Sequence, residues 1–235
     1  MRLDKYLASV TDLSRSDAKR AIKNGEVAVA GAVVGDPQFD VAADAQVTLR
    51  GRVLRTAAPR YFMLYKPEGY VCAARDRQHL TVLDLLDEDN VEDLHIAGRL
   101  DIDTTGLVLL TDDGQWSHRI TSPQRDCDKT YWLQTADPIP ETAVAHFERG
   151  LYLHNGKIHS EKTRLKPAFL DIIDPHTARL RISEGKYHQV KRMFGAIGNA
   201  VVKLHRERVG AITLDPDLDE GQYRPLTAAE IDSVQ

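Results

Sequence analysis

Near the middle of the chain lies the stretch Gly98-Arg99-Leu100-Asp101-Ile102-Asp103-Thr104-Thr105-Gly106-Leu107, which runs on into Val108-Leu109-Leu110. A basic residue, two carboxylates and small polar residues here lead directly into an apolar run suited to a buried strand. The pattern predicts carboxylates on a loop that a rigid strand supports, a common place for catalytic groups. Aspartates in such turns also serve only to satisfy backbone N–H groups, and composition alone favours that structural role for Asp101 and Asp103.

The composition is that of a folded, water-soluble chain. It has 235 residues, of which 42% are hydrophobic and 28% charged, values ordinary for globular proteins. No apolar run approaches the roughly 18–20 residues that cross a bilayer, and the N-terminus lacks the apolar stretch of a signal peptide. Cys72 and Cys127 lie far apart and are expected to stay reduced. These features predict a cytoplasmic protein without membrane contact.

The charges are segregated along the chain, although the net charge is only −4. Residues 1–58 carry 9 basic and 7 acidic side chains, and residues 179–208 carry 8 and 2. Six carboxylates fall between Asp84 and Asp93. Since binding to phosphates depends on the face that meets them, a chain of negative net charge can still bind nucleic acid.

The first 58 residues predict a small module of two helices followed by short strands. Leu3, Leu7 and Val10 recur at helical spacing. Ser14 is placed as the N-cap of a second helix, with Asp17 as its capping-box partner and Gly25 at its end. The strand candidates are Val27–Val29, Val33–Val34 and Val47–Leu49. A linker is expected from Arg55 to Pro59, so we expect one domain over 1–58 and another over 59–235.

Strands and helices are mixed irregularly in the second domain. Its predicted strands are Tyr61–Tyr65, Leu107–Leu110, Lys129–Gln134, Phe169–Ile173 and Ala178–Ile182. Its predicted helices are Val82–Leu86, Glu141–Gly150 and His188–Ile197. Because the order does not alternate regularly, it favours an α+β fold with a mixed, mainly antiparallel sheet and flanking helices over a repeating barrel.

Four blocks, in this order, resemble the pseudouridine synthases of the RsuA type. They are Tyr61 to Gly69, Gly98 to Gly114, Lys129-Thr130-Tyr131, and Glu184 to Met193. The opening 58 residues resemble an S4 domain, a small RNA-binding fold. The resemblance covers nearly the whole chain and implies an isomerase that converts a uridine of RNA to pseudouridine.

The family's functional residues can be carried over by position. The aspartate after Arg-Leu is catalytic in the family and corresponds to Asp101, and the tyrosine that packs on the target base corresponds to Tyr131. By the same resemblance Lys191 is the cation that keeps Asp101 ionised, with Arg192 as the alternative. Many relatives have arginine at the position of Lys191. Lysine cannot make the two parallel hydrogen bonds to a carboxylate that arginine makes. The resemblance further places Arg99, Thr105 and Arg192 at the substrate.

Six basic residues of the first domain are candidates for RNA contact: Arg2, Lys5, Arg15, Lys19, Arg20 and Lys23. Four of them crowd one helical stretch and can contact phosphates without reading sequence. Composition alone favours a merely solvated helix face. The resemblance to an S4 domain favours RNA binding instead.

Isomerisation of uridine needs no redox change and no group donor, so no cofactor is expected. The sequence contains no glycine-rich phosphate loop and no Cys/His cluster at metal-ligand spacing. His154 and His159 lie five residues apart on a polar stretch and lack ligand partners, so we expect no metal there either.

Two stretches are most similar to the family members that act on 16S, small-subunit ribosomal RNA: the string from Gly98 to Pro123, and Tyr223-Arg224-Pro225-Leu226. The expected partner is therefore ribosomal RNA within a small-subunit assembly intermediate, bound by a monomer. Three alternatives remain open: an enzyme for large-subunit rRNA, a non-catalytic RNA-binding assembly protein, and a hydrolase that uses Asp101 and Asp103 as a carboxylate pair.

Overall fold

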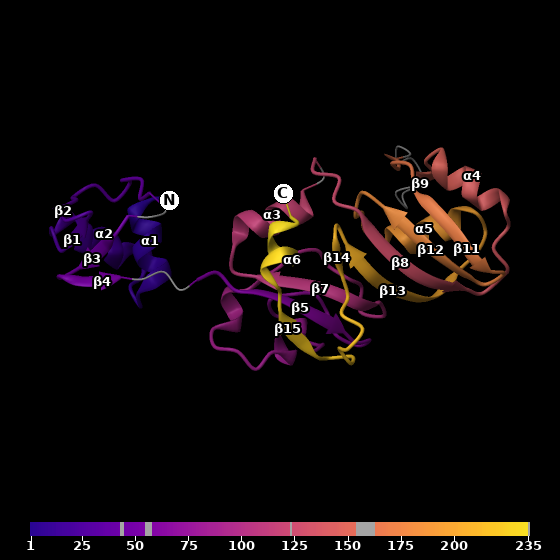
Figure 1. Ribbon diagram of the computed structural model, residues 1–235, viewed down its shortest axis with the longest axis horizontal. Coiled ribbons are helices and arrows are strands. Elements are labelled where there is room, and N and C mark those ends of the chain that lie inside the picture. Colours follow the sequence, from indigo (N-terminus) through magenta and orange to yellow (C-terminus); the bar gives the residue numbers. More distant parts are fainter. Residues whose placement is uncertain (43–44, 55–57, 123, 154–162, 235) are drawn as a thin grey trace. The chain divides into compact units, whose positions relative to one another are not determined.

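The computed structural model describes residues 1–42, 45–54, 58–122, 124–153 and 163–234 (Figure 1). The chain divides into two compact units, Met1–Ala58 and Pro59–Gln235, and each has its own hydrophobic core. Most of the expected linker, and both His154 and His159, lie outside the described residues. Cys72 and Cys127 are free thiols, as expected.

The first unit consists of two helices and a four-stranded antiparallel sheet. Helices α1 (Leu3–Val10) and α2 (Arg15–Lys23) precede β1 (Val27–Val29), β2 (Ala32–Val33), β3 (Val47–Leu49) and β4 (Arg52–Leu54), in the sheet order β2-β1-β3-β4. Ser14 is the N-cap of α2, as predicted. The capping box is incomplete, because the Asp17 carboxylate accepts the Ser14 hydroxyl at 2.6 Å and not a backbone N–H of the cap.

The second unit is built on one large sheet, which Figure 1 shows running from β15 and β5 to β12 and β11. Its strand order is β11-β12-β8-β13-β7-β5-β15, with β14 on β13 and β6 on β7. Among the strands that the structure describes, only β13 and β7 pair in parallel, so the expected mixed, mainly antiparallel sheet is confirmed. The bounds are β5 (Tyr61–Lys66), β6 (His95–Ile96), β7 (Thr105–Thr111), β8 (Lys129–Thr135), β11 (Phe169–Asp174), β12 (Thr177–Ile182), β13 (Val201–Val209), β14 (Ile212–Thr213) and β15 (Tyr223–Pro225).

Helices flank this sheet. They are α3 (Gly114–Thr121), α4 (Thr142–Glu148), α5 (Gln189–Ala196) and α6 (Ala228–Asp232), and a short hairpin of β9 (Tyr152–Leu153) and β10 (Thr163–Arg164) stands apart from the sheet. The helical stretch predicted over Val82–Leu86 is a 3-10 helix that covers Val82–Leu85, and the backbone of Leu86 is already extended. A second 3-10 turn covers Val91–Asp93.

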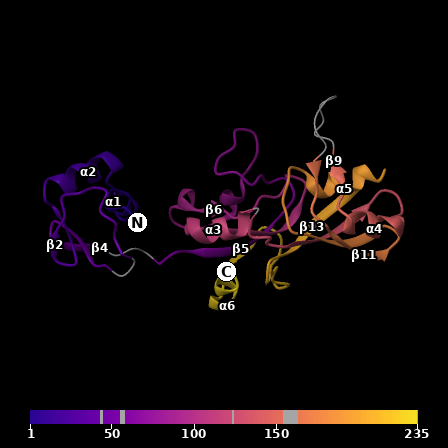
Figure 2. The same ribbon diagram turned by 90° about the horizontal axis from the view of Figure 1, so that it is seen from above.

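The run Leu107–Leu110 is buried on both faces of the sheet. Val108 and Leu110 face a core that includes Phe147 of α4 and Phe194 of α5, whereas Leu107 and Leu109 face a second core with α3. Figure 2 shows α3 beside β6 on the same half of the sheet. Alternation along a strand sends successive side chains to opposite faces. Because both faces are covered, β7 is a rigid support for the loop that precedes it.

The two halves of the sheet join where β13 meets β7. Only two residue pairs register there, His205 with Thr105 and Arg206 with Gly106. A Cβ on Gly106 would lie 2.4 Å from the Arg206 carbonyl oxygen, and the φ of Gly106 is +108°. Both the close approach and the backbone angle require glycine at this junction.

Candidate active site

A buried arginine holds the start of the loop that carries Asp101. Arg206 on β13 is 2% exposed. Its guanidinium donates to the carbonyl oxygens of Gly98 at 3.1 Å, Arg99 at 3.3 Å and Leu107 at 2.8 Å. Within the described part of the chain no carboxylate forms a salt bridge with it. The guanidinium of Arg206 therefore links the loop both to its own strand, β13, and to β7.

A buried lysine holds the other end of the same loop. The Nζ of Lys66, at the end of β5, donates to the carbonyl oxygens of Ile102 at 3.2 Å and Thr104 at 2.7 Å. Burial lowers the pKa of Lys66, and nearby groups, the Cys72 thiol first and then the carboxylates of Asp103 and Asp101, oppose that shift. The Lys66 side chain therefore lies beneath the loop.

Asp101 lies in a small cleft of about 80 Å³ between the loop, β8 and the start of α5. Two further residues predicted as catalytic from the sequence, Tyr131 of β8 and Lys191 of α5, line the same cleft. They come from segments 30 and 90 residues away in the chain. The other lining residues are Arg99, Leu100, Thr104, Ile182, Gly185, Lys186, His188, Gln189, Val190 and Leu204.

The ammonium of Lys191 lies between two carboxylates. It donates a hydrogen bond to Asp103 Oδ1 at 2.5 Å and stands 3.6 Å from Asp101 Oδ2. Burial raises the pKa of Asp103, but the hydrogen bond and charge of Lys191 outweigh it, so the pKa of Asp103 lies below its usual value. The expected ion pair between Lys191 and Asp101 is thus present, but the shorter contact goes to Asp103.

A second basic side chain, which the sequence did not place in the site, also contacts Asp101. His188 Nε2 lies 3.4 Å from Asp101 Oδ1. The other oxygen of this carboxylate, Oδ2, is the one that faces Lys191. The residue belongs to the fourth family-like block, where it was interpreted only as the start of a helix. Its backbone is left-handed, with φ at +48°, so His188 stands before α5 as its cap and turns its ring toward the loop.

Tyr131 forms a wall of the cleft. The residue is 8% exposed, and its hydroxyl has no hydrogen bond within the part of the chain that the structure describes. Thr104, also in the wall, is 1% exposed, and its hydroxyl likewise lacks a protein partner among the described residues. Both hydroxyls are therefore polar groups whose hydrogen-bonding capacity the fold leaves unused.

The remaining predicted substrate residues are placed differently. Arg99 is exposed at the cleft wall. Arg192 does not line the cleft, and its guanidinium donates to the Tyr187 carbonyl oxygen at 3.2 Å. Thr105 points away from Asp101, and its hydroxyl bonds to the Nδ1 of His205 at 2.8 Å. The structure thus brings Arg99 to Asp101 but not Arg192 or Thr105.

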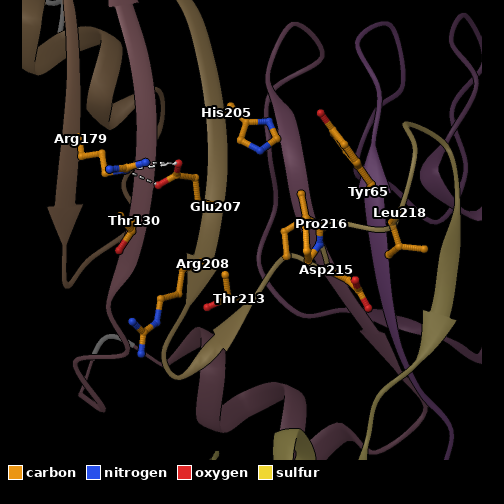
Figure 3. Close-up of a pocket in the computed structure, with 11 residues that line it drawn as sticks. Tyr65, Thr130, Arg179, His205, Glu207, Arg208, Thr213, Asp215, Pro216 and Leu218 are labelled. Atoms are coloured by element: carbon orange, nitrogen blue, oxygen red, sulfur yellow. Dashed lines mark hydrogen bonds and ion pairs between the residues drawn. The ribbon is translucent and has the colours of Figure 1, made fainter. Parts of the chain in front are cut away.

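A larger hollow of about 540 Å³ lies on another part of the sheet (Figure 3). Most of its charged side chains form ion pairs: Arg179 pairs with Glu207 at 3.0 Å, and Asp215 pairs with Arg224 at 2.6 Å. None of the site residues predicted from the sequence lines it. This hollow is larger than the cleft at Asp101, but the smaller cleft holds the carboxylate, the cations and the free hydroxyls that chemistry on a substrate needs.

Three of the six predicted RNA contacts gather around one buried carboxylate. Asp4 is fully buried, and its Oδ2 lies 2.9 Å from Arg2, 3.4 Å from Arg15 and 3.9 Å from Lys19. The hydrogen bond from Arg2 is the main reason that the pKa of Asp4 lies below its usual value. Three cations on one carboxylate leave the group with an excess of positive charge on an exposed face.

The other three basic residues are also exposed. Arg20 pairs with Asp17 at 2.6 Å. Within the described residues, Lys5 and Lys23 form no ion pair. The six predicted RNA contacts are therefore on the surface of α1, its N-cap residue Arg2 and α2. Two of them, Lys5 and Lys23, have no competing carboxylate among the described residues.

Comparison with known proteins identifies the family of each unit. The family model described as RNA pseudouridylate synthase matches residues 60–196, and the S4 domain model matches residues 1–47. Proteins named "Ribosomal small subunit pseudouridine synthase A" from Salmonella typhimurium and Escherichia coli are each 54% identical over 235 residues, covering 100% of both chains. The protein of the same name from Vibrio cholerae is 48% identical over 234 residues, covering 100% of this chain and 99% of that one.

A solved structure gives the same result for the fold. The structure named "Crystal structure of pseudouridylate synthase" is 46% identical and matches with a TM-score of 0.72 over 100% of both chains. In the described part of this chain no helix combines the length and apolar character needed to span a bilayer.

Proposed function

Because the chain belongs to the RNA pseudouridylate synthase family, we propose that it converts a uridine of 16S, small-subunit ribosomal RNA to pseudouridine, with Asp101 as the catalytic carboxylate. The observation that carries this assignment is the position of Asp101. Its two oxygens face Lys191 and His188 at 3.6 and 3.4 Å, in a cleft walled by Tyr131. The full-length relatives named for small-subunit rRNA support the choice of substrate.

The reaction breaks the N1–C1′ bond of uridine, turns the uracil and joins its C5 to C1′. C5 then loses its proton and N1 gains one, so the atoms balance without a redox partner. An ionised carboxylate can attack C1′ or remove the 2′ proton. Both routes need Asp101 charged, and the ammonium of Lys191 stands 3.6 Å from one of its oxygens.

Tyr131 and Arg99 act on the uridine and its surroundings. The ring of Tyr131 offers a flat face to the uracil, and its unpartnered hydroxyl is available to assist removal of the C5 proton. Arg99, exposed at the cleft wall, holds a flanking phosphate or fills the gap left when the uridine flips out. Extrusion costs a few kcal/mol and is least costly in unpaired RNA.

Thr105 and Arg192 support the site without lining it. Thr105 fixes His205 through the hydrogen bond between them, and Arg192 holds the Tyr187 carbonyl in the turn before α5. Both residues therefore shape the surroundings of the substrate.

The first unit supplies affinity for the RNA. Its exposed cations on α1 and α2 contact phosphates without reading sequence, while selectivity for one uridine comes from the RNA shape around the cleft. The substrate is rRNA within a small-subunit assembly intermediate, the enzyme acts as a monomer, and its place of action is the cytoplasm.

Asp101→Asn tests the proposal. Release of tritium from 16S RNA labelled at uracil C5 is measured for the wild type, Asp101→Asn and Asp103→Asn, with 23S RNA as the alternative substrate. We expect the wild type to act on 16S RNA, Asp101→Asn to be inactive though folded, and Asp103→Asn to keep most activity. Turnover by Asp101→Asn would remove Asp101 from its role. Release of free uracil would favour a hydrolase, and preference for 23S RNA would overturn the choice of substrate.

A further inference from the structure

An exposed aromatic ring stands directly outside the candidate active site. Tyr187 is 72% exposed, more than any other large apolar or aromatic side chain among the described residues. Its ring stacks on that of His188, with 3.8 Å between the centroids and 20° between the planes. Since His188 in turn meets Asp101 at 3.4 Å, the three side chains form a column that leads from solvent to the carboxylate.

The turn that carries this pair is held firmly. Arg192 donates to the Tyr187 carbonyl at 3.2 Å through its side chain and to the His188 carbonyl at 2.9 Å through its backbone. The Gln189 side chain accepts the Lys186 N–H at 2.9 Å and donates to Glu184 at 3.0 Å. His188 also keeps a left-handed backbone, which costs a non-glycine residue stability. These hydrogen bonds fix the backbone that carries the two rings.

Three basic side chains stand in the cleft beside the exposed ring. They are Arg99, Lys186 and Lys191. Lys186 is partly offset by Glu184 at 2.9 Å and Lys191 by Asp103 at 2.5 Å, whereas Arg99 has no ion pair among the described residues. Cations beside an open aromatic face match the chemistry of single-stranded RNA, whose backbone is anionic and whose bases stack. A uridine that is flipped toward Asp101 leaves its neighbours without a stacking partner.

We propose that Tyr187, backed by His188, is a stacking platform for the unpaired base next to the uridine held at Asp101. The inference rests on the proposed function, since Asp101 must hold the target nucleotide. One face of the Tyr187 ring is occupied by His188, and the flanking base takes the other. The platform contributes to binding of the RNA and takes no part in bond making.

The test combines protein and RNA changes. Dissociation constants of a 16S RNA fragment are measured by fluorescence anisotropy for the wild type, Tyr187→Ala, Tyr187→Phe and Tyr152→Ala. Tyr152 is a matched control, because it is also exposed, at 55%, but lies on β9. The same series is repeated with RNA in which each unpaired base near the modified uridine is removed in turn.

We expect Tyr187→Ala to weaken binding by about five- to a hundredfold, the usual range for losing one stacked base. Tyr187→Phe and Tyr152→Ala should bind like the wild type. With one particular base removed, the wild type and Tyr187→Ala should bind equally. Unchanged binding by Tyr187→Ala, or a defect that persists on every abasic RNA, would overturn the platform. Tritium release is scored separately, so RNA binding without isomerisation would count against the proposed function and not against this inference.

Discussion

The ammonium of Lys191 is hydrogen-bonded to Asp103 at 2.5 Å and stands 3.6 Å from Asp101. Asp103 thus fixes the position of the cation, while Asp101 receives its charge without its hydrogen bond. A carboxylate that must attack carbon or accept a proton is more reactive when its lone pairs are free. We infer that Asp103 positions Lys191, while Asp101 reacts with the substrate.

Asp103→Asn should reduce stability at neutral pH and leave most activity. The pKa of Asp103 is lowered in the folded state from 3.8, so its contribution is complete above pH 3.8 and is lost as pH falls through the folded value. Because the side chain is 54% exposed, we expect less than about 1 kcal/mol. Urea unfolding at pH 7 and below pH 3.8 measures the difference in the free energy of unfolding between wild type and variant. If this difference became larger in acid, the lowered pKa of Asp103 would be contradicted.

Lys191→Met should lower activity, most severely at acidic pH. Without the ammonium, Asp101 and Asp103 form a pair of like charges, which favours protonation as the pH falls. We expect a loss of up to about a hundredfold at neutral pH. Lys191→Arg restores the charge and should retain much of the activity. Single-turnover pH–rate profiles of the three proteins measure this, and an acidic limb unmoved in Lys191→Met would eliminate Lys191 as the partner of Asp101.

Gly106→Ala should unfold the second unit more easily and abolish activity. The new methyl group would meet the Arg206 backbone at 2.4 to 2.6 Å, so β13 must move, and with it the guanidinium that holds the Asp101 loop. A loss of about 3 kcal/mol or more is expected. Gly195→Ala is the control: it lies in α5 with no atom within 4 Å, and alanine there should stabilise by about 0.5–1 kcal/mol. Equal midpoints in urea for the two variants would refute the role of the junction.

Replacing both Lys5 and Lys23 by glutamine should weaken binding of rRNA and flatten its salt dependence. Each lost phosphate contact reduces the magnitude of the slope of log K against log salt by roughly 0.7–0.9. The slope of the double variant should therefore be smaller in magnitude by about 1.5. Arg50→Gln removes a cation of the same unit that is already paired with Glu26 at 2.7 Å and should leave the slope unchanged. If the double variant kept the wild-type slope, α1 and α2 would not be the phosphate-binding face.

Local sequence patterns predicted the two N-terminal helices and the apolar strands, but among the elements that they missed are the long strand β13 and the helix α3. Val201–Val209 contains Lys203, His205 and Arg206 among its apolar residues, so it lacks the apolar run that identified β7. The polar positions are explained by the fold. Along β13 one side chain bonds to Thr105 and another to the carbonyls of the Asp101 loop. For α3, the signal was present in Asp113, whose carboxylate caps the helix by accepting the N–H groups of Gln115 and Trp116.

The sequence by itself determined the family, the apolar strand Leu107–Leu110 and the carboxylate in front of it, because each depends on residues that are neighbours in the chain. Only the tertiary structure decided which side chains surround that carboxylate. Arg206 holds a carbonyl 107 residues away, because β13 lies between β8 and β7 in the sheet. Strand alternation turns Thr105 away toward His205 while Thr104 lines the cleft, and the left-handed turn at His188 brings its ring to Asp101. Such contacts depend on strand order and backbone angles, which residue spacing does not encode.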